Sequence, residues 1–221
     1  MPLSSHRARL EASFSQIQLM APLAGRAAAA TAGACHNFTI NWASILLTQP
    51  KYSTPASRMS ALSAIAGAGD VMLQKAYSNF FTEMRSSGAT TSILLQRADE
   101  LGYLSRGLKS KMVLNYDNFD ENRLVDKVIK SRPRPIDAGV AFVYSFMFNG
   151  SVVGAGGGAH TIGFFRKCAH NDKDSAGVVL AFDPNFGEYY MFPDELKEWF
   201  TSLRSVYGPF TADYMKEANV M

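Results

Sequence analysis

Apolar residues recur at helical spacing directly after a run of small residues in the first quarter of the chain. Phe38, Trp42, Ile45 and Leu46 fall on one face of a helix. This spacing predicts a buried helix. Cys35 lies at the expected start of that helix, where unpaired backbone N–H groups and the helix dipole stabilise a thiolate relative to a thiol.

Helical spacing also occurs elsewhere in the N-terminal half. Residues 3–21 carry an apolar stripe that predicts part arm and part helix, formed by Leu10, Phe14, Ile17 and Ala21. Pro22 is expected to end this helix. Two further helices are expected within 56–85, one over 92–104 and one after Asp120. The N-terminal half is therefore predicted to be mainly helical.

The hydrophobic pattern changes after the prolines of residues 132–135. Residues 139–148 are rich in β-branched and aromatic residues, which is typical of a buried strand. Three shorter apolar runs, separated by turn residues, follow at about 160–167, 177–182 and 187–192. These runs predict a mainly antiparallel sheet. A helical half followed by a sheet half predicts an α+β fold.

Length and composition fit one domain with a sizeable core. The chain has 221 residues and a mass of 24.2 kDa, and 47% of its residues are hydrophobic. We expect residues 1–30 to form an N-terminal arm, partly flexible or helical, and residues 31–221 to form a single domain. The formal net charge of +3 is small and the basic residues are scattered, so no nucleic-acid partner is expected.

The cysteine and histidine content limits the chemistry. Two cysteines, Cys35 and Cys168, are too few for a disulfide-stapled secreted domain and favour a reducing compartment. Cys168 is expected to be a small core residue. The four histidines have no spacing typical of metal sites, so no metal and no cofactor are expected.

No segment is expected to span a membrane. The longest nearly uncharged apolar run before residue 160 covers residues 139–148, about half of the ~20 residues that a membrane-spanning helix needs. The apolar stretch over 20–34 is similar to the core of a signal sequence, but Gly25 and Arg26 interrupt it. We therefore expect no cleaved secretory signal.

Three residues far apart in the chain have the chemistry of a nucleophilic hydrolase. Cys35 begins the expected helix, His160 opens one expected strand and Asp183 ends the next. Together they supply a nucleophile, a base that takes its proton, and a carboxylate that fixes the tautomer of the base. Each alone is equally consistent with a structural role: a buried thiol, a core histidine and a turn aspartate. His36 is a poor base for Cys35 because adjacent residues on a helix do not face each other.

The residues around these three positions resemble a known family. Cys35-x-x-Phe38-x-x-x-Trp42, His160-Thr-Ile-Gly and Phe182-Asp-Pro-Asn-Phe-Gly-Glu-Tyr are similar to the three motif blocks of the YopT/AvrPphB-type cysteine peptidases. The third block is the most specific. The resemblance implies a papain-like fold, in which a helical N-terminal half carrying the Cys helix packs against the C-terminal sheet.

The same resemblance implies a function. Members of the family are papain-fold effector proteases that bacteria inject into host cells. By resemblance, this protein is a secreted virulence protease that reaches the host cytosol without a signal peptide and cleaves a specific host protein. Its catalytic triad would be Cys35, His160 and Asp183, and the backbone N–H of Cys35 would contribute to the oxyanion site.

The sequence departs from the family pattern before the nucleophile. Papain-fold enzymes usually carry a Gln or Asn five or six residues before the cysteine, and its side-chain amide helps to bind the oxyanion. Here Ala29 and Ala30 occupy those positions. Thr31, Gln18 or a backbone N–H could act as the second oxyanion donor instead.

Two other classes of function stay open. The same triad on the same fold can deamidate glutamine or transfer acyl groups, and release of ammonia without backbone cleavage would distinguish a deamidase. Alternatively, the chain is a catalytically weak binding module that has kept the fold, an interpretation that Ala29 and Ala30 favour.

Overall fold

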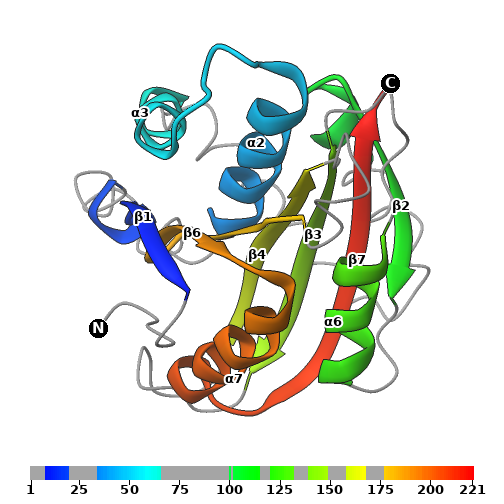
Figure 1. The fold of residues 1–221 in the computed structure, drawn as a ribbon. Coiled ribbons are helices and arrows are strands. Elements are labelled where there is room, and N and C mark those ends of the chain that lie inside the picture. Colours follow the sequence, from blue (N-terminus) through cyan, green and yellow to red (C-terminus); the bar gives the residue numbers. More distant parts are fainter. Residues whose placement is uncertain are drawn as a thin grey trace, which may run out of the picture.

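The computed structural model describes residues 8–19, 34–65, 100, 102–114, 120–131, 139–148, 158–167 and 177–221. The described strands form a seven-stranded antiparallel sheet in the order β1-β6-β5-β4-β3-β7-β2 (Figure 1). They are β1 (Arg9–Ser13), β2 (Leu108–Leu114), β3 (Gly139–Phe148), β4 (Gly158–Lys167), β5 (Val179–Asp183), β6 (Gly187–Met191) and β7 (Phe210–Val220). The helices are α2 (Cys35–Thr48), α3 (Pro55–Ile65), α6 (Glu121–Lys130) and α7 (Leu196–Tyr207), and the 3-10 turn η3 (Pro193–Glu195) leads into α7.

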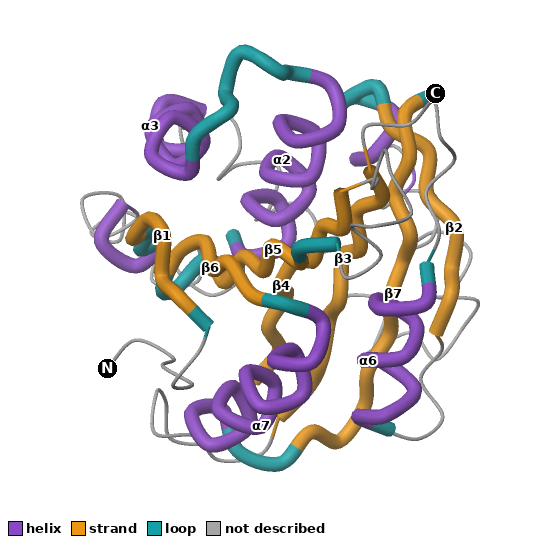
Figure 2. The backbone as a smooth tube through the Cα atoms, in the orientation of Figure 1, coloured by secondary structure: helices purple, strands orange, loops and turns teal. Residues whose placement is uncertain are grey.

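The sheet separates two hydrophobic clusters. The cluster on one face, called here the α2 cluster, joins α2 and α3 to the sheet and includes Phe38, Trp42, Leu62, Val143 and Phe182. The cluster on the other face, called here the α7 cluster, joins α6 and α7 to the sheet and includes Leu124, Tyr144, Phe164, Trp199 and Phe200. Figure 2 shows α6 and α7 away from α2 and α3. Alternate residues of β3 and β4 enter alternate clusters, as the two-residue period of a strand requires.

A glycine in the middle of β4 lets α2 approach the sheet closely. A Cβ atom at Gly163 would lie 2.7 Å from the ring of Trp42 and 3.1 Å from the side chain of Thr39. Real side chains do not fit at that distance, so only glycine allows this packing. Gly163 closes the second motif block, and its place in that block therefore has a packing reason.

A second glycine shapes the turn between β5 and β6. Gly187 has a φ of +129°, a conformation that L side chains rarely adopt, and a Cβ atom there would lie 2.1 Å from the carbonyl oxygen of Ala12 in β1. The turn is closed by a hydrogen bond of 3.0 Å from the N–H of Phe186 to the carbonyl of Asp183. This conformation fixes where the third motif block places Asp183.

Most elements of the sheet half agree with the sequence. The strand expected over 139–148 is confirmed as β3, and the three shorter runs are confirmed as β4, β5 and β6. The helix expected after Asp120 is α6, and the side chain of Asp120 caps it by accepting hydrogen bonds from the N–H groups of Asn122 and Arg123. The predicted α+β class is confirmed. Within the described ranges, no helix is long and apolar enough to cross a membrane.

The prediction of a helix within residues 3–21 is wrong for residues 9–13. These residues form β1, which pairs with β6 at one edge of the sheet, and among the described residues 8–19 the helix covers residues 16–19. Leu10 and Ala12 are half-buried while their neighbours are exposed, which is the alternation of a strand. This part of the expected arm therefore lies in the sheet. The boundary expected between residues 30 and 31 lies outside the described residues and stays a prediction.

The N-terminal half is also less helical than expected, because β2 lies within it. The hydrophobic pattern of the sequence predicts neither β2 nor β7, although β7 lies between β3 and β2 in the sheet. Asp213 and Lys216 are buried in β7 and interrupt its apolar pattern, which explains the omission. The first helix expected within 56–85 is α3, whereas the second lies outside the described residues, as does most of the helix expected over 92–104.

Candidate active site

Cys35 is the first residue of α2, as the sequence predicts. Ala34 precedes it without a side-chain cap, and no acidic residue lies in the first turn, so neither of these offsets the partial positive charge of the helix start. The residue is 6% exposed. The hydroxyl of Thr39 donates a hydrogen bond of 3.2 Å to the carbonyl of Thr161, which fastens the start of α2 to β4.

His160 is the third residue of β4 and is almost fully buried. Its Nε2 lies 2.9 Å from Oδ1 of Asp183, and its ring also forms a hydrogen bond with Cys35. Because Nε2 is taken by the carboxylate, Nδ1 is left for the sulfur. In this arrangement the carboxylate fixes which nitrogen faces the nucleophile.

The thiol and the imidazole come from opposite faces of the sheet. β4 pairs with β5 only over residues 163–166, whereas its pairing with β3 covers residues 158–167. In the described part of the chain, residues 158–162 of β4 therefore have a paired strand on one side only. Cys35 reaches this open end from the start of α2, on the face of the α2 cluster, and His160 packs against Phe146 on the face of the α7 cluster.

Asp183 ends β5 and has no exposed surface. Its carboxylate accepts three kinds of hydrogen bond: from His160, from the backbone N–H of Asn185 at 2.8 Å, and from the hydroxyl of Tyr207 at 3.0 Å to Oδ2. These donors replace the hydrogen bonds to water that a carboxylate loses on burial. The turn that follows β5 supplies one of them, and the end of α7 supplies another.

The pKa of the Cys35 thiol is lowered from its ordinary value. Burial alone raises this pKa, but the hydrogen bond with His160, the positive charge of His160, and hydrogen bonds from the backbone and side chain of Thr161 together outweigh burial. The surroundings therefore favour a thiolate at Cys35.

The pKa of His160 is raised to about 10. Burial alone lowers it, but the charge of Asp183 and the hydrogen bond to Asp183 raise it, and the contacts with Cys35 add to the rise. Both shifts act in the same direction, because each favours a proton on the imidazole and negative charge on the sulfur. Such a thiolate–imidazolium pair is a strong nucleophile beside a proton donor.

The structure thus brings Cys35, His160 and Asp183 together, and their catalytic roles remain predictions. His36, the alternative base, is buried within α2. Gln18, one of the three suggested oxyanion donors, is exposed in the helical turn after β1. Residues 29–31 and Cys168 lie outside the described residues. Within the described ranges, no three His, Cys, Asp or Glu residues are arranged to hold a metal ion.

Sequence reasoning missed two residues that contact the three predicted ones. Thr161 forms hydrogen bonds with Cys35, and Tyr207 donates to Asp183. Thr161 lies inside the second motif block, so the block itself could have pointed to it. Tyr207 ends an amphipathic helix and is indistinguishable by its spacing from a core tyrosine.

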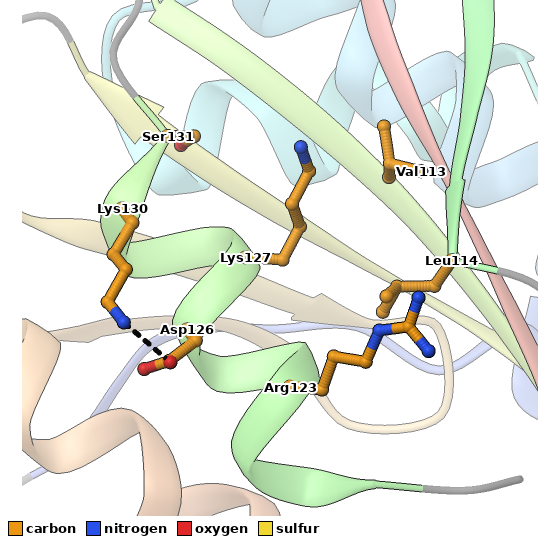
Figure 3. A pocket seen from close by; sticks show the side chains of 7 residues that line it. All are labelled: Val113, Leu114, Arg123, Asp126, Lys127, Lys130 and Ser131. Carbon is orange, nitrogen blue, oxygen red and sulfur yellow. Dashed lines mark hydrogen bonds and ion pairs between the residues drawn. The ribbon is translucent and has the colours of Figure 1, made fainter.

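A pocket of about 320 Å³ lies elsewhere, between α6 and β2 (Figure 3). It is lined by Val113, Leu114, Arg123, Asp126, Lys127, Lys130 and Ser131. Lys130 forms an ion pair of 2.6 Å with Asp126 along α6. None of the lining residues belongs to the group formed by Cys35, His160 and Asp183, so the pocket is separate from the candidate active site.

Comparison with known proteins supports the fold. No family model matches the sequence, and no curated protein matches it. Among solved structures, the chain is similar to the Pseudomonas avirulence protein AvrPphB, with a TM-score of 0.51. The match covers 85% of this chain and 92% of that chain, at 14% sequence identity. The chain therefore has an AvrPphB-like fold, which confirms the fold that the three motif blocks predict.

Proposed function

We propose that this protein is a cysteine endopeptidase that uses Cys35 as the nucleophile, His160 as the acid and base, and Asp183 to orient the imidazole. The observation that carries the proposal is the hydrogen-bonded series from the Cys35 thiol through the His160 ring to the Asp183 carboxylate, in a fold similar to that of AvrPphB. By the family resemblance, the substrate is a specific host protein and the enzyme is delivered as a bacterial effector.

In the first half of the reaction, the Cys35 thiolate attacks the carbonyl carbon of the scissile peptide bond, and the carbonyl oxygen becomes an oxyanion. The backbone N–H of Cys35 lies at the start of α2, where it has no intrahelical partner, so it can donate to that oxyanion. The His160 imidazolium transfers its Nδ1 proton to the departing amine as the C–N bond breaks. A thioester on Cys35 and a free amine result.

In the second half, water hydrolyses the thioester. Nδ1 of His160 takes a proton from water as the oxygen attacks the acyl carbon, and the C–S bond then breaks. The acid product leaves, and Cys35 returns to the thiolate beside a protonated His160. One water is consumed for each peptide bond broken, while Asp183 keeps its charge and stabilises the imidazolium.

The test compares the wild-type protein with Cys35→Ala in lysates of candidate target cells, followed by mass spectrometry of new protein N-termini. We expect new termini, confined to few proteins, with the wild type alone, and we expect His160→Ala to abolish them as well. His36→Ala is the matched control, because it removes a buried imidazole next to Cys35 that takes no part in the proposed series. It should leave the new termini unchanged.

Three outcomes would contradict the proposal. Ammonia release without new termini would indicate a deamidase, and an acylated product protein would indicate an acyltransferase. Binding of a lysate protein without any covalent change, by a folded wild type whose Cys35 does not react with iodoacetamide, would indicate a binding module.

A further inference from the structure

The hydroxyl of Tyr207 is bonded to the carboxylate that orients the imidazole. It lies 3.0 Å from Oδ2 and 3.3 Å from Oδ1 of Asp183. Within the described residues, Oδ1 also accepts hydrogen bonds from Nε2 of His160 and from the backbone N–H of Asn185. The Tyr207 hydroxyl is the one donor to Oδ2 among these residues. Together with the two donors to Oδ1, the hydroxyl therefore restricts the rotation of the carboxyl group about its Cβ–Cγ bond.

A series of side-chain amides sets the direction in which this hydroxyl donates. Nδ2 of Asn185 donates to the Tyr207 oxygen at 2.8 Å, so the tyrosine proton is left for Asp183. Oδ1 of Asn185 in turn accepts from Nε2 of Gln16 at 2.7 Å, which fixes the orientation of the Asn185 amide. Donors thus follow one another from Gln16 through Asn185 and Tyr207 to Asp183. Hydrogen bonds that point the same way strengthen one another in a buried site.

The ring of Tyr207 covers the imidazole. Its centroid lies 4.8 Å from that of His160, with an angle of 24° between the two planes, which is a stacked arrangement. Phe146 meets the same imidazole edge-on at 5.7 Å. Tyr207 is itself 1% exposed. The two aromatic rings limit the rotation of His160 and exclude water from its ring.

The hydroxyl also stays protonated. Burial and then the nearby charge of Asp183 raise the pKa of Tyr207 well above its ordinary value. Tyr207 is the last residue of α7, so the helix on the face opposite α2 supplies this contact.

We propose that Tyr207 is a positioning residue: its hydroxyl holds the carboxylate of Asp183 in the orientation that binds Nε2 of His160, and its ring holds the imidazole against that carboxylate. Asn185 supports this role by directing the hydroxyl. The proposal rests on the proposed function, since Tyr207 acts only through His160 and Asp183.

The experiment measures the pKa of the Cys35 thiol, which requires no substrate. The rate of alkylation by iodoacetamide is followed against pH, with peptide mass spectrometry to count reaction at Cys35 alone. Tyr207→Phe keeps the stacked ring and removes the hydroxyl. Tyr207→Phe loses a hydrogen bond to a charged group and holds the imidazolium less well. We therefore expect the midpoint of the curve of Cys35 alkylation rate against pH to rise by about 0.5 to 1 pH unit.

The matched control is Tyr144→Phe. The hydroxyl of Tyr144 donates to a buried carboxylate, Asp213 Oδ2, at the same distance of 3.0 Å. Asp213 lies in β7, and among the described residues it shares no hydrogen bond or ion pair with the triad. This variant loses the same chemical group from the same cluster and should leave the midpoint unchanged. Once a substrate is known, Tyr207→Phe should lower kcat roughly tenfold at unchanged KM, and Tyr144→Phe should change neither.

The outcomes separate the two proposals. A wild-type midpoint near ~8.5 that His160→Ala does not move would overturn the proposed function. A low wild-type midpoint that Tyr207→Phe does not move, or that Tyr144→Phe moves equally, would overturn the role of Tyr207 alone. If Tyr207→Phe does not fold, Asn185→Ala replaces it, because this change removes the group that directs the hydroxyl. It should raise the midpoint by a smaller amount, and an unchanged midpoint would count against the proposal.

Discussion

The indole N–H of Trp42 donates a hydrogen bond of 2.7 Å to Oε2 of Glu188, which joins α2 to β6. Glu188 is fully buried, and Arg58 of α3 donates to both of its oxygens. The guanidinium also binds the backbone carbonyls of Tyr52 and Ser53. Both buried charges are thereby compensated, and the glutamate of the third motif block has a structural explanation.

Arg58→Ala should lower the free energy of unfolding by about 3–5 kcal/mol, because it leaves Glu188 as a buried charge without its counterion. Urea denaturation monitored by tryptophan fluorescence would measure this. Lys130→Ala is the control, since it breaks an exposed ion pair with Asp126 of 2.6 Å and should cost less than about 0.5 kcal/mol. Equal losses in the two variants would show that burial of the pair does not matter.

Gly163→Ala should destabilise the protein by about 1–3 kcal/mol, because the added methyl overlaps the ring of Trp42 and forces α2 away from β4. The same displacement should slow alkylation of Cys35 at neutral pH, since α2 carries the thiol. Gly102→Ala is the matched control: its Cβ would meet one atom, Cδ1 of Ile40, at an ordinary 3.9 Å. If both variants unfold at the same urea concentration as the wild type, the inference that α2 packs too closely on β4 for a side chain at position 163 is wrong.

His160 should titrate near pH 10, because the charge of Asp183 favours the imidazolium. NMR titration of the histidine Cε1–H signals, assigned with His160→Ala, would measure this. In Asp183→Asn the charge of Asp183 is absent while burial and the contacts with Cys35 remain, so the midpoint should fall well below that of the wild type. A midpoint that is the same in both proteins would exclude the ion pair.

The direction of each shift also sets how stability depends on pH. The pKa of His160 is higher in the folded than in the unfolded protein, so its contribution is complete below pH ~6.5 and is lost as the pH rises through about 10. The pKa of Cys35 is lower in the folded protein, so its contribution is present above ~8.5 and is lost as the pH falls through the lowered value. The difference in unfolding free energy between the wild type and His160→Ala, measured by urea denaturation, should therefore shrink as the pH rises through about 10.

The sequence predicts those elements whose pattern is dominated by burial. β3 lies in the sheet interior and is apolar at almost every position, so its bounds follow from composition. The sequence does not predict β1, because the alternation over its five residues is too short to outweigh the helical spacing of Leu10, Phe14 and Ile17. The sequence does not predict β7 either, because two charged residues are buried in it. Asp213 is bonded to Tyr144 and Lys216 lies over the ring of Tyr103, and no periodicity reveals such partners.

Some residues of the candidate site can be predicted from the sequence, and others cannot. Cys35, His160 and Asp183 lie within motif blocks whose residue types and order indicate a mechanism, so they can be found without coordinates. Tyr207 lies on a different element from all three and reaches Asp183 only because α7 ends beside β5. A contact made between separate elements leaves no trace in local spacing.

The thiol of Cys35 is carried by α2, which packs into the α2 cluster, whereas the imidazole of His160 contacts Phe146 and Tyr207 of the α7 cluster. Repacking one interior moves one member of the pair while the other stays in place. Poor turnover in a well-expressed, cooperatively folding protein is therefore the expected phenotype of substitutions far from the sulfur, in either interior.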